Sequence, residues 1–153
     1  MSEMTDKEFV LSVMKRHGLT DAESLQERSA DMDGTEINAE DFAIPDFREA
    51  VRAKNMLERP IGFICKSSAG RVVRLLQAYD STIYTQEPEE LPAQFGFVWS
   101  KDPKKAKPFI ALSTSPYNTG DCCTEDGTFR STMDGNVWSP STYPQGWETI
   151  VME

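Results

Sequence analysis

Hydrophobic residues recur at two different spacings along the chain, and the change between them falls near residue 60. Before it, apolar positions recur every three or four residues, as on one face of an α-helix. After it, apolar residues form short runs separated by Gly, Pro, Ser and Thr, which is typical of β-strands and turns. The pattern therefore predicts a helical leader over residues 1–59, followed by a β-rich remainder.

Three helices are expected in the leader. The sequences TDKE (5–8) and TDAE (20–23) match the capping box, whose side chains hydrogen-bond the free N–H groups at a helix start. A clear apolar stripe follows the first box, whereas the weak stripe after the second predicts only a short helix. A third helix is expected from near Pro45, which suits a first turn, to Pro60. Residues 31–34 (DMDG) are expected to form a loop.

The β-rich remainder is expected to contain two hairpins. The runs 61–65 and 71–76 flank a turn-forming Ser-Ser-Ala-Gly sequence, and 94–99 is a candidate strand. Near the C-terminus, Asp126-Gly127 lies between two β-runs and is a strong signal for a two-residue hairpin turn, because both positions need positive φ. The Lys-rich segment 101–108 is expected to be a polar linker.

The two β-rich segments share an order of landmarks that indicates an internal repeat, although a chance likeness between two hairpins is the alternative. In this alignment Gly62, Gly70, Pro88 and Trp99 correspond to Gly120, Gly127, Pro140 and Trp147. Trp99 would then be a core residue, as the counterpart of Trp147. We therefore expect a β-rich module with a linker over residues 60–110, which is the candidate repeat, and a second β-module over residues 111–153.

The last third carries the most specific motifs. In order they are YNTGD (117–121), GTF (127–129), DGNVWSP (134–140) and YPQGWE (143–148). This pattern resembles the carbohydrate-binding module of the chitinase type, and above all the version at the end of bacteriophage tail and baseplate proteins. The resemblance implies an α+β fold with a helical N-terminal leader and one or two small antiparallel β-modules of carbohydrate-binding-module type. Chitin-binding members carry two exposed aromatic residues after the second strand, where this chain has Ser-Thr-Met (131–133).

A sugar-binding surface needs exposed aromatic rings, on which the apolar faces of sugar rings stack, and polar groups that bind the hydroxyls. The candidate carbohydrate-binding residues are Tyr117, Asn136, Trp138, Tyr143 and Trp147. The alternative is that the aromatic residues fill the core, because so small a module has little other apolar material. The core is favoured for Trp147, whereas Trp138 and Tyr143 fit either role.

Charge narrows the range of partners. The chain has 153 residues and a formal net charge of −9, which argues against nucleic acid and anionic membranes. Residues 1–60 carry 14 acidic and 8 basic side chains, and residues 111–153 carry 6 and 1. No apolar stretch is long enough for membrane insertion, and the first residues lack the pattern of a signal peptide.

Metal binding and catalysis are not expected. Cys65, Cys122 and Cys123 have no Cys-x-x-Cys spacing and the chain has one histidine, so we expect buried, reduced thiols rather than a zinc site. The motifs of serine hydrolases, P-loop proteins and zinc proteases do not occur. No acidic residue is singled out as a glycosidase carboxylate. We therefore expect no cofactor, no metal and no catalytic residue.

The resemblance implies a tail or baseplate component of a bacteriophage or prophage, and the missing catalytic motifs predict that it is not an enzyme. Its expected partners are other tail and baseplate proteins, host cell-surface polysaccharide and further copies of the same chain. A virion protein made in the bacterial cytoplasm and released by lysis needs no signal peptide, in contrast to a secreted binder. The alternative is a chitin-like carbohydrate-binding module that is accessory to a glycan-degrading enzyme.

Overall fold

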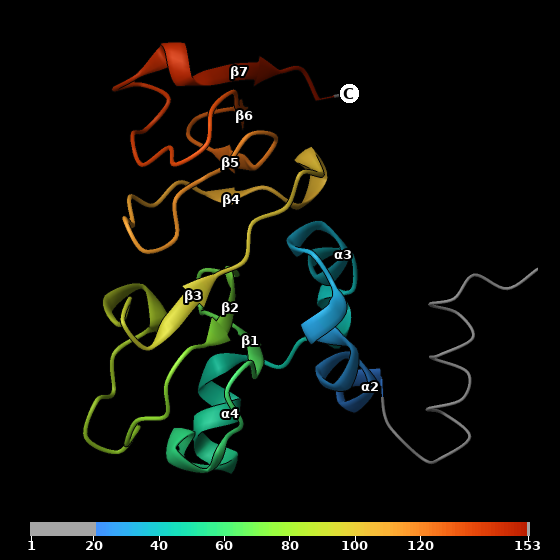
Figure 1. Ribbon diagram of the computed structural model, residues 1–153, viewed down its shortest axis with the longest axis vertical. Coiled ribbons are helices and arrows are strands. Elements are labelled where there is room, and N and C mark those ends of the chain that lie inside the picture. The colour runs from blue at the N-terminus through green and yellow to red at the C-terminus, as the bar shows by residue number, and fades with distance from the viewer. Residues whose placement is uncertain (1–20, 153) are drawn as a thin grey trace, which may run out of the picture.

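The computed structural model describes residues 21–152 as a mixed α+β fold, mostly β, with two small sheets (Figure 1). The antiparallel first sheet contains β1 (Ile64–Lys66), β2 (Val72–Leu75) and β3 (Phe95–Phe97). The mixed second sheet contains β4 (Lys107–Pro108), β5 (Cys122–Thr124), β6 (Thr128–Ser131) and β7 (Trp147–Ile150). Within the second sheet, β4 and β5 pair in parallel, and the other neighbouring strands pair antiparallel. The two sheets follow one another along the long axis of the molecule (Figure 1).

The α-helices of the described residues precede the first sheet: α2 (Asp21–Arg28), α3 (Gly34–Ala39) and α4 (Phe47–Ala53). Sequence reasoning missed α3, which starts at a capping box between Asp33 and Glu36 in the predicted loop. The prediction that the third helix reaches Pro60 was wrong. α4 ends at Ala53, and Asn55 then caps the short 3-10 helix η3 (Met56–Glu58). The helix predicted after residue 5 lies outside the described residues.

The first sheet is buried on both faces. On one face, Ile64 and Val72 pack with Leu25, Ile37 and Ile44 from the helical part of the chain. On the other face, side chains such as those of Cys65 and Val73 belong to a larger cluster that continues into the second sheet. Since successive strand residues point to opposite faces, burial of both faces explains the unbroken apolar runs in the sequence.

Stacked aromatic rings join the two sheets. The Tyr117 ring lies 4.4 Å from the Trp99 ring, with 16° between their planes, and 5.4 Å from the Phe109 ring. Trp147 meets Tyr117 edge-on at 5.3 Å. The Tyr117 hydroxyl accepts a hydrogen bond from the Ile110 N–H at 3.3 Å. The core is therefore continuous across the sequence boundary at residue 110.

The two sheets repeat one backbone pattern. We call residues 60–110 the first unit and residues 111–153 the second unit. In each unit the pattern starts with a glycine in the left-handed region, Gly62 at φ +94° and Gly120 at φ +97°. The N–H of this glycine donates to the carbonyl of the last residue of β2 in the first unit and of β6 in the second. The matched donor–acceptor pairs are Gly62–Leu75 with Gly120–Ser131, Leu75–Phe63 with Ser131–Asp121, and Leu76–Gln94 with Thr132–Gly146. Three shared pairings in the same order support the repeat that the sequence indicated.

The strand register corrects the alignment of that repeat. β2 pairs Leu75 with Phe95, and β6 pairs Ser131 with Trp147, so Phe95 rather than Trp99 is the counterpart of Trp147. Trp99 is buried, but it lies beyond β3, where its indole N–H donates to the Ser115 carbonyl at 3.0 Å. The prolines shift too, because the 3-10 helices before β3 and β7 are η4 (Pro88–Glu90) and η6 (Pro144–Gly146).

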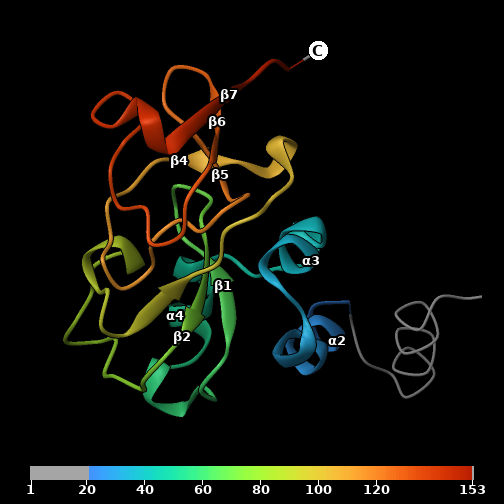
Figure 2. The same ribbon diagram turned by 45° about the horizontal axis from the view of Figure 1, so that its top comes forward.

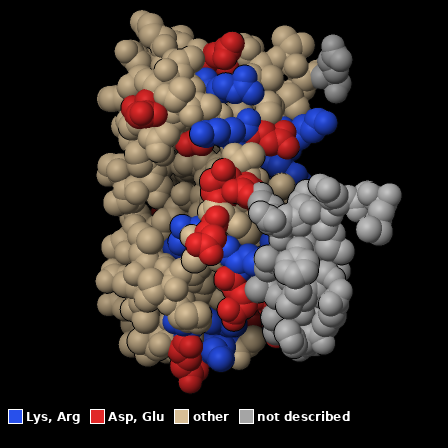
Figure 3. All heavy atoms as spheres, turned by 45° about the vertical axis from the view of Figure 1, so that its right-hand side comes forward, with Lys and Arg blue, Asp and Glu red and all other residues tan. Residues whose placement is uncertain are grey.

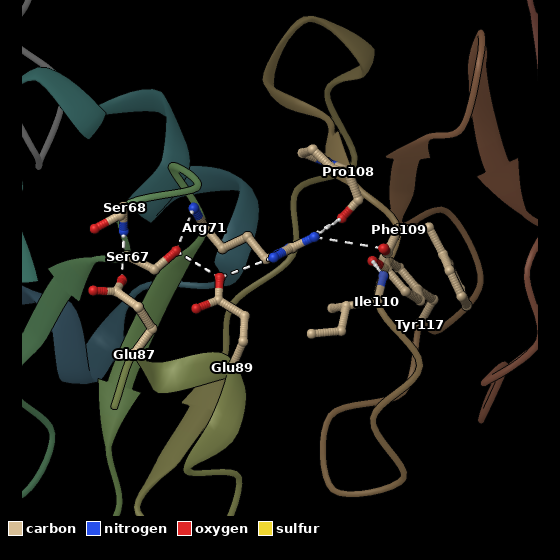
Figure 4. Close-up of polar contacts among 9 residues, drawn as sticks. All are labelled: Ser67, Ser68, Arg71, Glu87, Glu89, Pro108, Phe109, Ile110 and Tyr117. Atoms are coloured by element: carbon tan, nitrogen blue, oxygen red, sulfur yellow. Dashed lines mark hydrogen bonds and ion pairs between the residues drawn. The ribbon is translucent and has the colours of Figure 1, made fainter. Parts of the chain in front are cut away.

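Arg71 ties the hairpin of the first sheet to the second sheet (Figure 4). Its guanidinium donates to the Pro108 carbonyl of β4 at 2.9 and 3.0 Å and pairs with Glu89 at 2.9 Å. The Ser67 hydroxyl donates to the same Glu89 oxygen at 2.7 Å. The Arg71 and Glu89 side chains are only 10% and 15% exposed. The predicted linker 101–108 is thus part of the fold, with η5 (Pro103–Lys105) and β4 within it.

Arg71→Met is expected to lower the free energy of unfolding by about 3 kcal/mol, because the nearly buried Glu89 carboxylate loses its counter-charge. The control is Arg130→Met, which removes an exposed ion pair with Glu148 at 4.0 Å and should cost less than about 1 kcal/mol. Urea unfolding followed by tryptophan fluorescence measures both. Equal losses would contradict the bridging role of Arg71.

Candidate functional site

The structure divides the five candidate carbohydrate-binding residues into two groups. Tyr117, Asn136 and Trp147 are buried, whereas Trp138 is 45% and Tyr143 is 39% exposed. A sugar in solution cannot stack on the buried rings or reach the buried amide. Surface contact is therefore left to Trp138 and Tyr143, and the other three residues act within the fold.

Asn136 positions Trp138 rather than facing solvent. Its side-chain N–H groups donate to the Gly146 carbonyl at 3.0 Å and the Ser131 hydroxyl at 3.1 Å. Its side-chain oxygen accepts the backbone N–H of Trp138 at 3.2 Å. Its backbone also pairs with that of Tyr117 at 2.8 and 2.9 Å. Every polar group of this buried amide is used, as buried polar groups require.

Trp147 holds the same loop from the other side. Its indole N–H donates to the carbonyl oxygen of Trp138 at 2.8 Å. The Trp138 peptide groups are therefore fixed by two buried residues, Asn136 at the N–H and Trp147 at the carbonyl. A loop restrained in this way presents its exposed side chains with little loss of entropy on binding.

Trp138 and Tyr143 form a pair of neighbouring rings at the surface. Their centroids lie 5.6 Å apart and their planes meet at 53°. The turn between them is closed by the N–H groups of Thr142 and Tyr143, which donate to the Ser139 carbonyl at 3.1 and 2.8 Å. Glu125 of the β5–β6 hairpin accepts the N–H at position 141 at 2.9 Å. Two flat apolar surfaces are thus held side by side.

Three hydroxyl groups lie on the turn between the rings, and sequence reasoning missed them. The Ser139 oxygen lies 2.8 Å from the Thr142 hydroxyl and 3.2 Å from the Ser141 hydroxyl. Hydroxyl groups both donate and accept, so they match the hydroxyls of a sugar ring. The Ser-Pro-Ser-Thr sequence between two aromatic residues was the available signal.

Two carboxylates close to this loop are used within the fold. Asp121 and Asp134 accept the backbone N–H groups of Asn118 at 2.8 Å and Thr119 at 2.9 Å. Burial raises the pKa of Asp121, whereas the hydrogen bond from the Thr119 N–H lowers the pKa of Asp134.

Within residues 21–152, no three His, Cys, Asp or Glu side chains are grouped to hold a metal ion. No helix of that range is long and apolar enough to cross a bilayer.

The cysteine thiols are free and buried. Burial raises the pKa of Cys65 and of Cys123 from 9.0 to about 12. The two residues hold equivalent positions in the repeat, each at the centre of the first strand of its unit.

Comparison of the chain with family models, with curated proteins and with solved structures found no match. The proposed function therefore depends on the residues and contacts described above and on the resemblance of the last third of the sequence.

Stability is expected to fall in alkaline solution. Above about pH 9 the thiols of the unfolded chain lose their protons, whereas Cys65 and Cys123 in the folded chain keep theirs up to about pH 12. The free energy of unfolding therefore decreases across this window as pH rises. The double variant Cys65→Val and Cys123→Val should reduce this slope in urea unfolding at several pH values, although burial also raises the pKa of Tyr79 and Tyr117. Leu25→Ala, which truncates a buried side chain of the separate cluster on the helix side of the first sheet, is the control and should keep the slope. An unchanged slope in the double variant would contradict the assignment.

Proposed function

We propose that this chain is a non-enzymatic tail or baseplate component of a bacteriophage or prophage, and that Trp138 and Tyr143 contact glycan on the host cell surface. The observation that carries the glycan contact is the exposed ring pair on its braced turn. The module around it, residues 111–153, is of carbohydrate-binding-module type in this proposal.

The exposure of these rings has a free-energy cost that binding would remove. The other two tryptophans, Trp99 and Trp147, are buried, so Trp138 alone leaves an indole in water. Exposed aromatic residues grouped on a restrained surface are typical of binding sites. The flanking hydroxyl groups supply the hydrogen bonds that a sugar needs for orientation.

The sequence resemblance of the last third supports the phage setting, together with the order of a helical leader before β-modules. The same proposal includes other tail and baseplate proteins as partners, assembly of several copies, and location in the virion. The net charge of −9 agrees with a glycan rather than nucleic acid as ligand.

A second candidate function is a chitin-like binding module accessory to a glycan-degrading enzyme, because the same ring pair could serve it. Residues 131–133, where chitin-binding members carry two exposed aromatic residues, count against it. They are Ser-Thr-Met and present no aromatic surface. Ser131 is also buried, and its hydroxyl donates to the Met133 carbonyl at 2.7 Å. We therefore favour the phage component.

Trp138→Ala and Tyr143→Ala are each expected to weaken glycan binding about tenfold, because each removes one stacking surface. The measurements are a glycan array and co-sedimentation with bacterial cell-wall fragments that retain their surface polysaccharide. Phe42→Ala is the control, since Phe42 is a 74% exposed ring on the separate 3-10 helix η2 (Asp41–Ala43). Its binding should match that of the unchanged protein.

Three outcomes decide between the candidates. Retention on chitin beads but not on bacterial walls would favour the accessory module. Retention on walls that the Trp138 and Tyr143 variants lose would support the phage component, as would neighbouring genes for tail fibres or holins. Absence of retention on every probe, or equal retention by a variant that combines Trp138→Ala with Tyr143→Ala, would refute the glycan contact.

A further inference from the structure

The internal repeat extends beyond the strands into the turn that carries the ring pair. In the second unit, the N–H of Tyr143 donates to the carbonyl of Ser139, four residues earlier, at 2.8 Å. In the first unit, the N–H of Tyr84 donates to the carbonyl of Asp80, also four residues earlier, at 3.0 Å. The residue before each tyrosine donates to the same carbonyl, at 3.1 and 3.2 Å. Tyr84 therefore occupies the position of Tyr143.

The surroundings of the two turns correspond as well. An aromatic residue precedes each turn, Tyr79 in the first unit and Trp138 in the second, and a proline-initiated 3-10 helix follows each. The side chain of the first turn residue accepts a backbone N–H within the turn in both units. These bonds are Thr82 N–H to Asp80 at 3.0 Å and Thr142 N–H to Ser139 at 3.1 Å.

The two units differ in which rings reach the solvent. Tyr79 is buried and meets Phe95 edge-on at 5.7 Å, whereas its counterpart Trp138 is exposed. Tyr84 is 50% exposed, and the neighbouring Ile83 is 68% exposed. The first turn thus presents one ring with an apolar neighbour where the second turn presents two rings.

The first turn is braced as firmly as the second. The Asp80 carboxylate accepts the Asn55 side-chain N–H at 2.9 Å and the Thr82 hydroxyl at 2.6 Å. Asn55 in turn accepts the N–H of Ser81 at 3.2 Å. The hydrogen bonds from Thr82 and then Asn55 lower the pKa of Asp80, which keeps the accepting carboxylate ionised.

The two turns lie on the same side of the molecule, at different heights along its long axis. Both views show the yellow-green loop after β2 and the orange-red loop before β7 at the left edge (Figures 1 and 2). The helices α2 and α3 lie on the other side (Figure 1). Figure 3 brings forward the right-hand side of Figure 1, away from the two turns. Acidic and basic side chains are intermixed on that face, without a large area of one sign.

We propose that Tyr84 is a second glycan contact, so that one polysaccharide chain binds at both turns. This inference depends on the proposed function, because Trp138 and Tyr143 make the first contact. Once a polymer is held at one turn, its second contact is intramolecular and strengthens binding without a new encounter. A short saccharide fills only one turn and gains nothing from the other.

The test uses Tyr84→Ala with two probes. The first probe is bacterial cell-wall fragments, and the second is the mono- and disaccharides that partial acid hydrolysis releases from them. Tyr84→Ala should weaken retention on the fragments at least ~10-fold. It should leave unchanged the titration of the Trp138 indole N–H by the short saccharides, followed by NMR. Tyr84→Phe, which keeps the ring, should bind the fragments like the unchanged protein, and thermal unfolding shows that the variants are folded.

The outcomes separate this inference from the proposed function. If Trp138→Ala loses binding to the fragments and Tyr84→Ala does not, the second contact is wrong and the proposed function stands. If Trp138→Ala keeps full binding, the proposed function itself is wrong. If Tyr84→Ala weakens the short-saccharide titration as much as fragment binding, Tyr84 acts through the first site, and the second contact is again refuted.

Discussion

The burial of one ring, that of Tyr117, is the constraint on which the rest of the structure depends. Stacking against Trp99 brings the end of the first unit against the second, and contact with Trp147 brings in the last strand. Burial also raises the pKa of the Tyr117 hydroxyl, which stays neutral while it accepts the Ile110 N–H. Through its backbone pairing with Asn136, the same residue fixes the loop that carries Trp138. Core packing and surface presentation are therefore determined together.

The two units share a backbone but differ in what covers their outer faces. In the first unit, Ile64 and Val72 face the helices, and their counterparts in the second unit are Cys122 and Thr128. Cys122 is covered by the segment around Lys101, where its thiol lies 3.7 Å from the carbonyl, and Thr128 is only partly buried. The smaller and more polar residues explain why one unit needs helices and the other does not.

Local signals in the sequence were sufficient where the structure is local. Asp126 and Gly127 have the expected positive φ values, 51° and 136°, and the chain turns there between β5 and β6. The prediction of a two-residue turn was wrong, because Thr124 pairs with Thr128 and leaves three residues between the strands. β1 and β2 form the expected hairpin. The capping box at Asp33 is equally local, and it was overlooked in a segment that resembled a loop. Asn136 could not be interpreted in this way, because its partners lie five and ten residues away and bury it only once the loop closes. The register of β3 was hidden for a similar reason, since extra residues between Tyr84 and Phe95 move the strand relative to Trp99.

The contacts of Arg71 limit how the two units of this repeat can change in evolution. Glu89, its ionic partner, belongs to η4 of the first unit, whereas the Pro108 carbonyl belongs to the sheet of the second. Separation of the chain before β4 would leave a nearly buried ion pair short of an acceptor and expose the faces of Trp99 and Tyr117 to water. Two units that share their core in this way do not fold independently. Further evolution can alter their loops independently, but neither unit can be deleted or exchanged alone.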